Sequence, residues 1–276
     1  MPELIGVTVS VVPDIKHNLL LFDRIAYPTA VTILQRWPES QFAAELRWLI
    51  DLGIVFVPGG QFPASVEGQA AVAEAARDLI AARNKRDAGS AVGFDVEDAF
   101  ARLFAVHLRD GDRLNAVPIM SDWRPVPDQK TTQVDVVHLV IRALPMPSES
   151  HSLEDLLHFR KAMASEGLVQ SLRVWMDDVA SGRTTVVEAG DKLEDLVARY
   201  ERALQLERMR VHSGMVETLV VTTAQIAESL AKMRWSKLAK GLFDVRRKKV
   251  DLMRAEMQLP GRELAYISRA REKFVE

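Results

Sequence analysis

Apolar residues follow two different spacings along this chain. In the first part, short runs rich in Val, Ile, Leu and Phe stand between turn-forming residues, which predicts strands. Elsewhere, apolar residues recur every three or four positions, which predicts helices. The expected strands cover residues 5–12, 19–25, 54–57 and 114–120, and the expected helices of this part cover 38–52, 65–86 and 95–107. We therefore expect an α+β fold with a small mixed sheet covered by helices.

The run from Val134 to Leu144 is compatible with two structures. Its apolar residues are almost continuous, so their periodicity does not separate a buried strand from a buried helix. We expect it to add a strand to the sheet. A buried helix stays open as the alternative.

Proline is distributed very unevenly. Eleven of the twelve prolines lie at or before Pro147, and none lies between Ser148 and Leu259. Because proline costs about 3 kcal/mol inside a helix, such a long run without it is typical of a helical region. We expect an α/β-type lobe at residues 1–147 and an all-helical lobe, a bundle, at residues 148–276.

Helix starts can be placed inside the second lobe. Ser152 with Asp155, and Thr185 with Glu188, have the spacing of capping boxes. The apolar stripes that follow them predict packed helices, and the last helix is expected after the break at Pro260 and Gly261. The residues expected to face the core are Leu172, Trp175, Met176, Val179, Leu193, Leu196, Val197, Tyr200, Leu204 and Met209.

Composition narrows the class of protein. The chain has no cysteine, which excludes disulfides, thiolate catalysis and iron–sulfur clusters. Residues 1–17 carry Glu3 and no basic cluster ahead of their apolar run, so we expect no secretory signal. The longest weakly charged stretch near the C-terminus, 218–226, is far shorter than the roughly 20 apolar residues of a membrane span. We expect a cytoplasmic protein without a membrane partner.

The net charge of −2 conceals an asymmetry. Residues 1–150 hold 14 Lys and Arg against 19 Asp and Glu, whereas residues 151–276 hold 22 against 19. Basic residues concentrate in the segment 232–254, which we call the basic segment. Its candidate contacts to an anion or a partner are Lys232, Arg234, Lys237, Lys240, Arg246, Arg247, Lys248 and Lys249.

Two roles fit the basic segment. Four consecutive bases cannot share one helix face, because successive helical residues turn by about 100°. We therefore expect solvated helix faces that dock against the acidic first lobe, a partner protein or a second copy. Binding of nucleic acid or phosphate is the alternative, with contacts that salt would weaken steeply.

Motifs for catalysis are absent. The chain contains no GxxxxGK[ST], GxGxxG, GxSxG or HExxH. His151, Glu154 and His158 would share one side of a helix, but no fourth metal ligand is evident, so we expect no metal and no cofactor. Fragments with Asp and Lys at 13–16 and 128–130 leave a hydrolase or nuclease as a third hypothesis.

A few polar residues are candidates for a pocket. Asp23 and Arg24 directly follow apolar residues of an expected strand, and Asp122 and Arg124 follow another. In open α/β sheets the carboxyl ends of the strands line the ligand crevice. His107, on an expected helix, completes the set. An ion pair at the sheet edge is the alternative role for Asp23 and Arg24.

Two segments resemble an uncharacterised family of bacterial hypothetical proteins that carry a domain of unknown function. One is 136–147 followed by 153–160, which includes ALPMPSESHSLEDLLHFR, and the other is LPGRELAYI at 259–267. This resemblance implies no activity, cofactor or site residue. From the residues alone, we expect an interaction or regulatory protein without catalysis.

Overall fold

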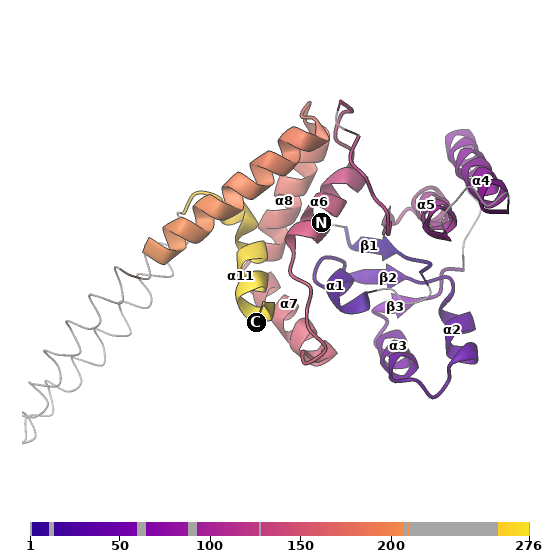
Figure 1. Cartoon of the computed structure of the whole chain (residues 1–276), viewed down its shortest axis with the longest axis horizontal. Coiled ribbons are helices and arrows are strands. Elements are labelled where there is room, and N and C mark those ends of the chain that lie inside the picture. The colour runs from indigo at the N-terminus through magenta and orange to yellow at the C-terminus, as the bar shows by residue number, and fades with distance from the viewer. Residues whose placement is uncertain are drawn as a thin grey trace, which may run out of the picture.

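The centre of the fold is a parallel sheet. A computed structural model describes residues 2–10, 14–59, 65–87, 93–126, 128–206, 209 and 259–275. Strands β1 (Leu4–Val7), β2 (Arg24–Ala26), β3 (Val55–Phe56) and β4 (Asn115–Pro118) lie in the order β3-β2-β1-β4. Figure 1 labels β1, β2 and β3. The α+β class is confirmed. Every described strand pairing is parallel, however, whereas a mixed sheet was expected.

Five helices accompany the sheet among the described residues of the first part of the chain. They are α1 (Ile15–Leu19), α2 (Ala30–Arg36), α3 (Gln41–Asp51), α4 (Val66–Asp87) and α5 (Gly93–Asp110). Helices α3, α4 and α5 correspond to the three that the spacing predicts, and α2 was not expected.

The expected strand at 19–25 is largely wrong. Leu19 ends α1, whose N-cap Asp14 accepts a hydrogen bond from the backbone N–H of His17, and β2 begins only at Arg24. The apolar residues between them are buried in a turn, where Phe22 is fully enclosed. Their apolar character therefore reflects burial in the core rather than sheet pairing.

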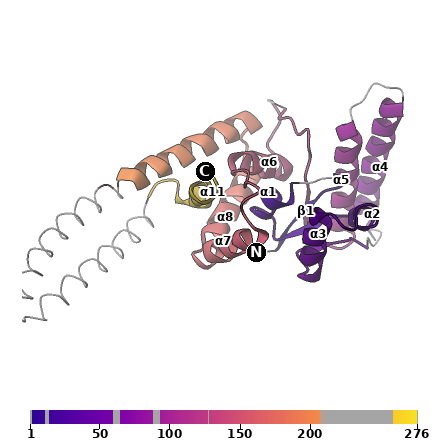
Figure 2. The same cartoon turned by 60° about the horizontal axis from the view of Figure 1, so that its bottom comes forward.

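Both faces of the sheet are buried, with side chains alternating between them. Ile5, Val7 and Ala116 pack with Ala105 and Leu108 of α5 on one face. The other face contributes Leu4, Ile25, Val55 and Val117 to the main core, which also contains residues of α1, α3 and the helices that follow β4. Helix α4 packs on α5 rather than on the sheet, and the pair lies on the side of the molecule away from α7 and α11 (Figure 2).

The second part of the chain is helical in its described residues. It contains α6 (Gln133–Ala143), α7 (Leu153–Ser165), α8 (Leu168–Ser181), a helix over 186–206, a 3₁₀ turn (Arg262–Leu264) and α11 (Ala265–Phe274). None of the described helices combines the length and the apolar character that crossing a membrane requires.

The strand expected at 134–144 is wrong, and the helical alternative is correct. Thr132 and Asp135 form a reciprocal capping box that starts α6. Val136, Val137 and Val140 are fully buried at helical spacing, which places one face of α6 against the sheet.

The predicted capping boxes at Ser152 and Thr185 are confirmed. Ser152 and Asp155 exchange side-chain and backbone hydrogen bonds, as do Thr185 and Glu188. The expected core residues of α8 and of helix 186–206 are buried, except Leu196, which is partly buried. The expectation for Met209 is wrong, because this residue is 59% exposed. The main core contains residues from both parts of the chain, and a division near residue 147 stays a prediction.

Gly261 packs against the backbone of helix 186–206. Its φ is +80°, and a Cβ at this position would lie 2.5 Å from the Leu196 carbonyl oxygen. We expect Gly261→Ala to lower the free energy of unfolding by about 2 kcal/mol or more, because left-handed backbone strain and a steric clash add together. Urea denaturation measures the loss.

Gly53→Ala is the matched control for this substitution. Gly53 has a φ of +69°, but nothing lies within 4 Å of a Cβ added there. It should therefore lose only the backbone component, roughly 1 kcal/mol. Equal losses in the two variants would show that the contact with Leu196 is unimportant.

Candidate ligand-binding cavity

The start of α5 occupies the place where open parallel sheets usually hold a ligand. The chain proceeds from β1 outward to β3 and then returns to the other side of β1, so the strand order reverses between β1 and β4. At this point Asp98 of α5 accepts backbone hydrogen bonds from Ser121 at 2.8 Å and Asp122 at 3.3 Å, just after β4. The carboxylate of Asp98 thus takes the donors that would otherwise be available to a ligand.

Glu97, the neighbour of Asp98, faces the end of β1. Its carboxylate is hydrogen-bonded by Ser10, while its Oε2 is buried without a hydrogen-bond partner in the described part of the chain. Burial raises the pKa of Glu97. It also raises the pKa of Asp98, which is the more deeply buried of the two residues. The reversal point is therefore filled by protein side chains.

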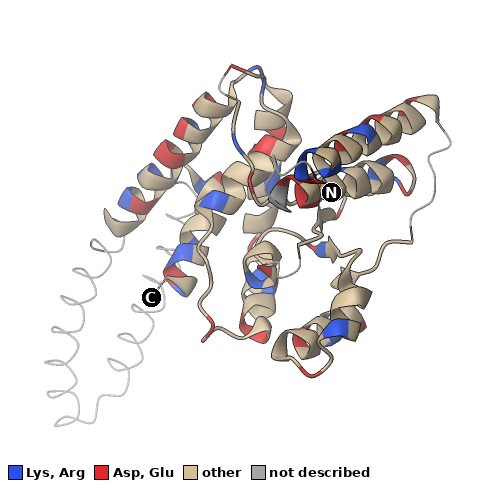
Figure 3. Cartoon of the chain, turned by 45° about the vertical axis from the view of Figure 1, so that its right-hand side comes forward, with Lys and Arg blue, Asp and Glu red and all other residues tan. Residues whose placement is uncertain are grey.

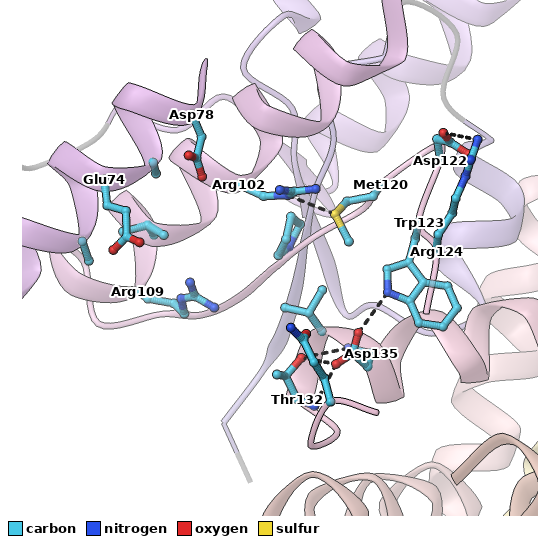
Figure 4. Close-up of a pocket in the computed structure, with 16 residues that line it drawn as sticks. Glu74, Asp78, Arg102, Arg109, Met120, Asp122, Trp123, Arg124, Thr132 and Asp135 are labelled. Atoms are coloured by element: carbon cyan, nitrogen blue, oxygen red, sulfur yellow. Dashed lines mark hydrogen bonds and ion pairs between the residues drawn. The ribbon is translucent and has the colours of Figure 1, made fainter. Parts of the chain in front are cut away.

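A cavity of about 600 Å³ lies instead beside the edge strand β4. Helices α4 and α5 form one side, Pro118 and Met120 at the end of β4 form the back, and the connection to α6 and the first turn of α6 close the other side (Figure 4). This volume is within the range of small-molecule sites, roughly 300–1,000 Å³.

Helices α4 and α5 present opposite charges to this cavity. Glu74 and Asp78, four residues apart, line it from one face of α4. Arg102 and Arg109, seven residues apart, line it from one face of α5. Ala71 and Ala75 of α4 and Val106 of α5 supply apolar surface between the charged groups.

The two arginines are weakly engaged by the protein. Arg102 donates from Nε to the Met120 sulfur at 3.2 Å, a weak acceptor. Arg109 is half-buried, and its guanidinium has no hydrogen bond or ion pair among the described residues. Burial lowers the pKa of Arg109, an effect that Asp110 partly offsets, but an arginine remains charged at neutral pH.

The opposite side of the cavity is rigidly bonded. Trp123 is 5% exposed, and its Nε1 donates to Asp135 Oδ1 at 3.1 Å. Asp135 Oδ2 accepts from the backbone N–H and the hydroxyl of Thr132, at 2.9 and 2.7 Å. The Arg142 guanidinium lies 4.6 Å from the Trp123 ring centroid. These contacts hold Trp123 in place and occupy the Asp135 carboxylate.

His138 holds the connection between β4 and α6 in place through its hydrogen bonds. Its Nε2 accepts the N–H of Met120 at 3.0 Å, and its Nδ1 lies 2.8 Å from the Val134 carbonyl oxygen, so Nδ1 carries the proton. The ring stacks on Trp123, with centroids 5.3 Å apart. Burial lowers the pKa of His138 to about 4, so the ring is neutral at physiological pH.

Comparisons with known proteins give no further guide to this cavity. No family model, curated protein or solved structure matches the chain. This agrees with the resemblance to an uncharacterised family.

The structure brings two of the sequence-predicted pocket residues to the cavity. Asp122 and Arg124 follow β4, line the cavity and form an exposed ion pair at 2.8 Å. His107 is a half-buried residue near the end of α5 and is not among the residues that line this cavity.

Asp23 and Arg24 lie at the other end of the sheet. Asp23 precedes β2 and Arg24 is its first residue, so both lie at the amino end of this strand rather than after a strand as expected. Asp23 binds Arg160 of α7 at 2.9 Å and Arg173 of α8 at 2.5 Å, and it also accepts the backbone N–H of Leu4 at 2.9 Å. It thereby connects the sheet to the helices that follow α6.

Arg24 has separate partners. Its Nε donates to the Gly53 carbonyl oxygen at 3.0 Å, and its guanidinium lies 4.3 Å from the Phe56 ring centroid and 3.8 Å from the Glu3 carboxylate. Its contacts connect neighbouring strands at their edge.

The other sequence hypotheses concern metal and nucleic acid. Within the described residues no three His, Asp or Glu side chains converge as metal ligands would. His151 instead contacts the Ser148 hydroxyl at 2.9 Å and packs edge-on against Phe274, while His158 is exposed.

The basic segment 232–254 lies outside the residues that the structure describes, so its role stays a prediction.

Sequence reasoning missed the two arginines of the cavity. The spacing of Arg102, Val106 and Arg109 places all three on one helix face, which the sequence contains. A pair of arginines on a helix is ordinarily a solvated pair, however. The packing of α4 beside α5, and of α6 opposite, makes both arginines part of the lining of one cavity.

Proposed function

We propose that this protein binds a small anionic ligand in the cavity beside β4, and that Arg102 and Arg109 hold its anionic group. The observation that carries this proposal is the Arg109 guanidinium, which is partly desolvated in a cavity of ligand size and forms no hydrogen bond or ion pair with another described residue. Ligand binding of this kind is compatible with the regulatory role expected from the sequence.

The physical argument concerns desolvation. Moving a guanidinium out of water without a carboxylate or phosphate partner costs free energy. A bound anion would offset that cost, because the planar guanidinium donates two parallel hydrogen bonds to a carboxylate or phosphate. Arg102 lies two helical turns away on the same face and can contact the same anion or a second one.

Arg109→Met tests this function by a combination of two results. The variant keeps the aliphatic stem but removes the charge, so the ligand-free protein should melt at the same temperature or slightly higher. Stabilisation by phosphate, pyrophosphate or citrate should fall. At 100 times the dissociation constant, a ligand adds about 2.7 kcal/mol of stability, which is roughly 5–10 °C in a chain of this size.

Thermal melting at constant ionic strength measures both quantities. Arg47→Met is the control, since Arg47 is an exposed residue of α3 that does not line the cavity. It should retain the full anion effect, including the general stabilisation that excluded salts give every protein. If Arg109→Met melted several degrees lower and kept the anion effect, Arg109 would have a structural role.

A further inference from the structure

The cavity contains both signs of charge on facing helices. Glu74 and Asp78 extend from α4 toward the space that Arg102 and Arg109 border from α5 (Figure 4). Both helices of this pair carry acidic and basic residues along their length (Figure 3). Yet none of the ion pairs in the described part of the chain joins these acids to these arginines.

A simple anion would be poorly matched to this arrangement. If it bound the arginines, it would also lie near two exposed carboxylates that repel it. Asp122 and Asp135, the other lining acids, are already occupied by Arg124 and by Thr132 with Trp123. Glu74 and Asp78 therefore remain as the uncompensated negative groups of the cavity.

We propose that the ligand is a zwitterion of amino-acid type, whose anionic group binds Arg102 and Arg109 and whose ammonium group binds Glu74 and Asp78. This proposal rests on the proposed function and adds the second, cationic half of the ligand. An ammonium donates three hydrogen bonds, so it can serve two carboxylates at once. It also converts the repulsion of a bound anion into attraction.

The remaining lining defines the body of this ligand. Between the charged groups the cavity is bordered by aliphatic side chains, namely Ala71, Ala75, Val106, Pro118 and Val134. The lining thus favours an aliphatic side chain carried beside the ammonium and the carboxylate, as in leucine.

A matched ligand series tests the ammonium directly. Isothermal titration of the full chain would compare leucine with 4-methylpentanoate, which lacks the ammonium, and with 3-methylbutylamine, which lacks the carboxylate. Phosphoethanolamine and inorganic phosphate form the corresponding pair for a phosphate group. We expect each zwitterion to bind at least tenfold more tightly than its single-charge analogues.

Variants of α4 assign the effect to its acids. Glu74→Gln and Asp78→Asn should each reduce the preference for leucine over 4-methylpentanoate severalfold, and the double variant should abolish it. Binding of the anions alone should be unchanged or tighter, because the repelling carboxylates are gone. Glu194→Gln, an exposed residue of helix 186–206 away from the cavity, is the control and should keep the preference.

The outcomes separate the two proposals. If the wild-type protein binds 4-methylpentanoate or phosphate as tightly as the zwitterions, the zwitterion proposal is wrong, while anion binding stands. If the zwitterions are preferred but the α4 variants keep that preference, the ammonium does not bind Glu74 and Asp78, which also overturns the proposal. If no probe binds, the proposed function fails as well.

Discussion

Replacing Asp23 with alanine is expected to lower the free energy of unfolding by about 3–5 kcal/mol. Arg160 and Arg173 are each only 14% exposed in their side chains, and both are paired with this one carboxylate. The Nε atoms of both arginines are buried without hydrogen-bond partners in the described structure, and Arg160 has a further side-chain hydrogen bond with Tyr266. Loss of Asp23 would leave two charges partly buried and the N–H of Leu4 without its acceptor.

Urea denaturation at neutral pH measures this loss, and Asp122→Ala provides the control. Asp122 also pairs with an arginine, at 2.8 Å, but the Arg124 side chain is 80% exposed. Exposed pairs contribute about 0–1 kcal/mol, so this variant should stay close to the wild type. A loss below about 1 kcal/mol for Asp23→Ala would mean that the helices are held to the sheet by apolar packing alone.

His138 should make the protein sensitive to acid. Its pKa is about 4 in the folded protein, against about 6.5 in an unfolded chain, so the unfolded state binds the proton more tightly. The stability that the neutral ring contributes is therefore complete above pH 6.5 and is lost as the pH falls toward 4. The difference corresponds to roughly 3 kcal/mol.

A comparison with His138→Gln isolates this contribution. Glu97 and Asp98 have raised pKa values, and they act in the opposite direction, because their protonation favours the folded state as the pH falls. Both carboxyl groups are present in the wild type and in the variant, so their effect cancels. Urea unfolding from pH 7 to pH 4 should show a steeper loss in the wild type. Equal slopes would contradict a neutral, buried His138.

The errors in predicting the fold have a common physical cause. Apolar runs report burial, and burial is shared by strands, helices and turns in the core. Leu20 to Phe22 are buried in a turn after α1, and the 134–144 run is buried in α6. Local capping signals carried the missing information. Asp14, and Thr132 with Asp135, mark helix starts in the sequence itself.

The cavity was only partly predictable for a different reason. Asp122 and Arg124 were found because the residues that follow a parallel strand lie at its carboxyl edge. Asp23 and Arg24 were expected there by the same rule, but β2 begins at Arg24, so both residues lie at the amino end of that strand. No local sequence pattern predicts the position of Arg109 in the cavity, because that position depends on how α4 and α6 pack beside α5.

The two edges of the sheet are poor templates for aggregation. Strand β3 has only two residues, so it offers little backbone to an incoming strand. At the other edge, Ile119 donates its N–H inward to Val7, which turns the nitrogen of Pro118 outward, where it has no hydrogen to donate. The Ala116 N–H is engaged by Leu114 within the same chain. A partner protein would therefore meet helices rather than extend this sheet by β-augmentation.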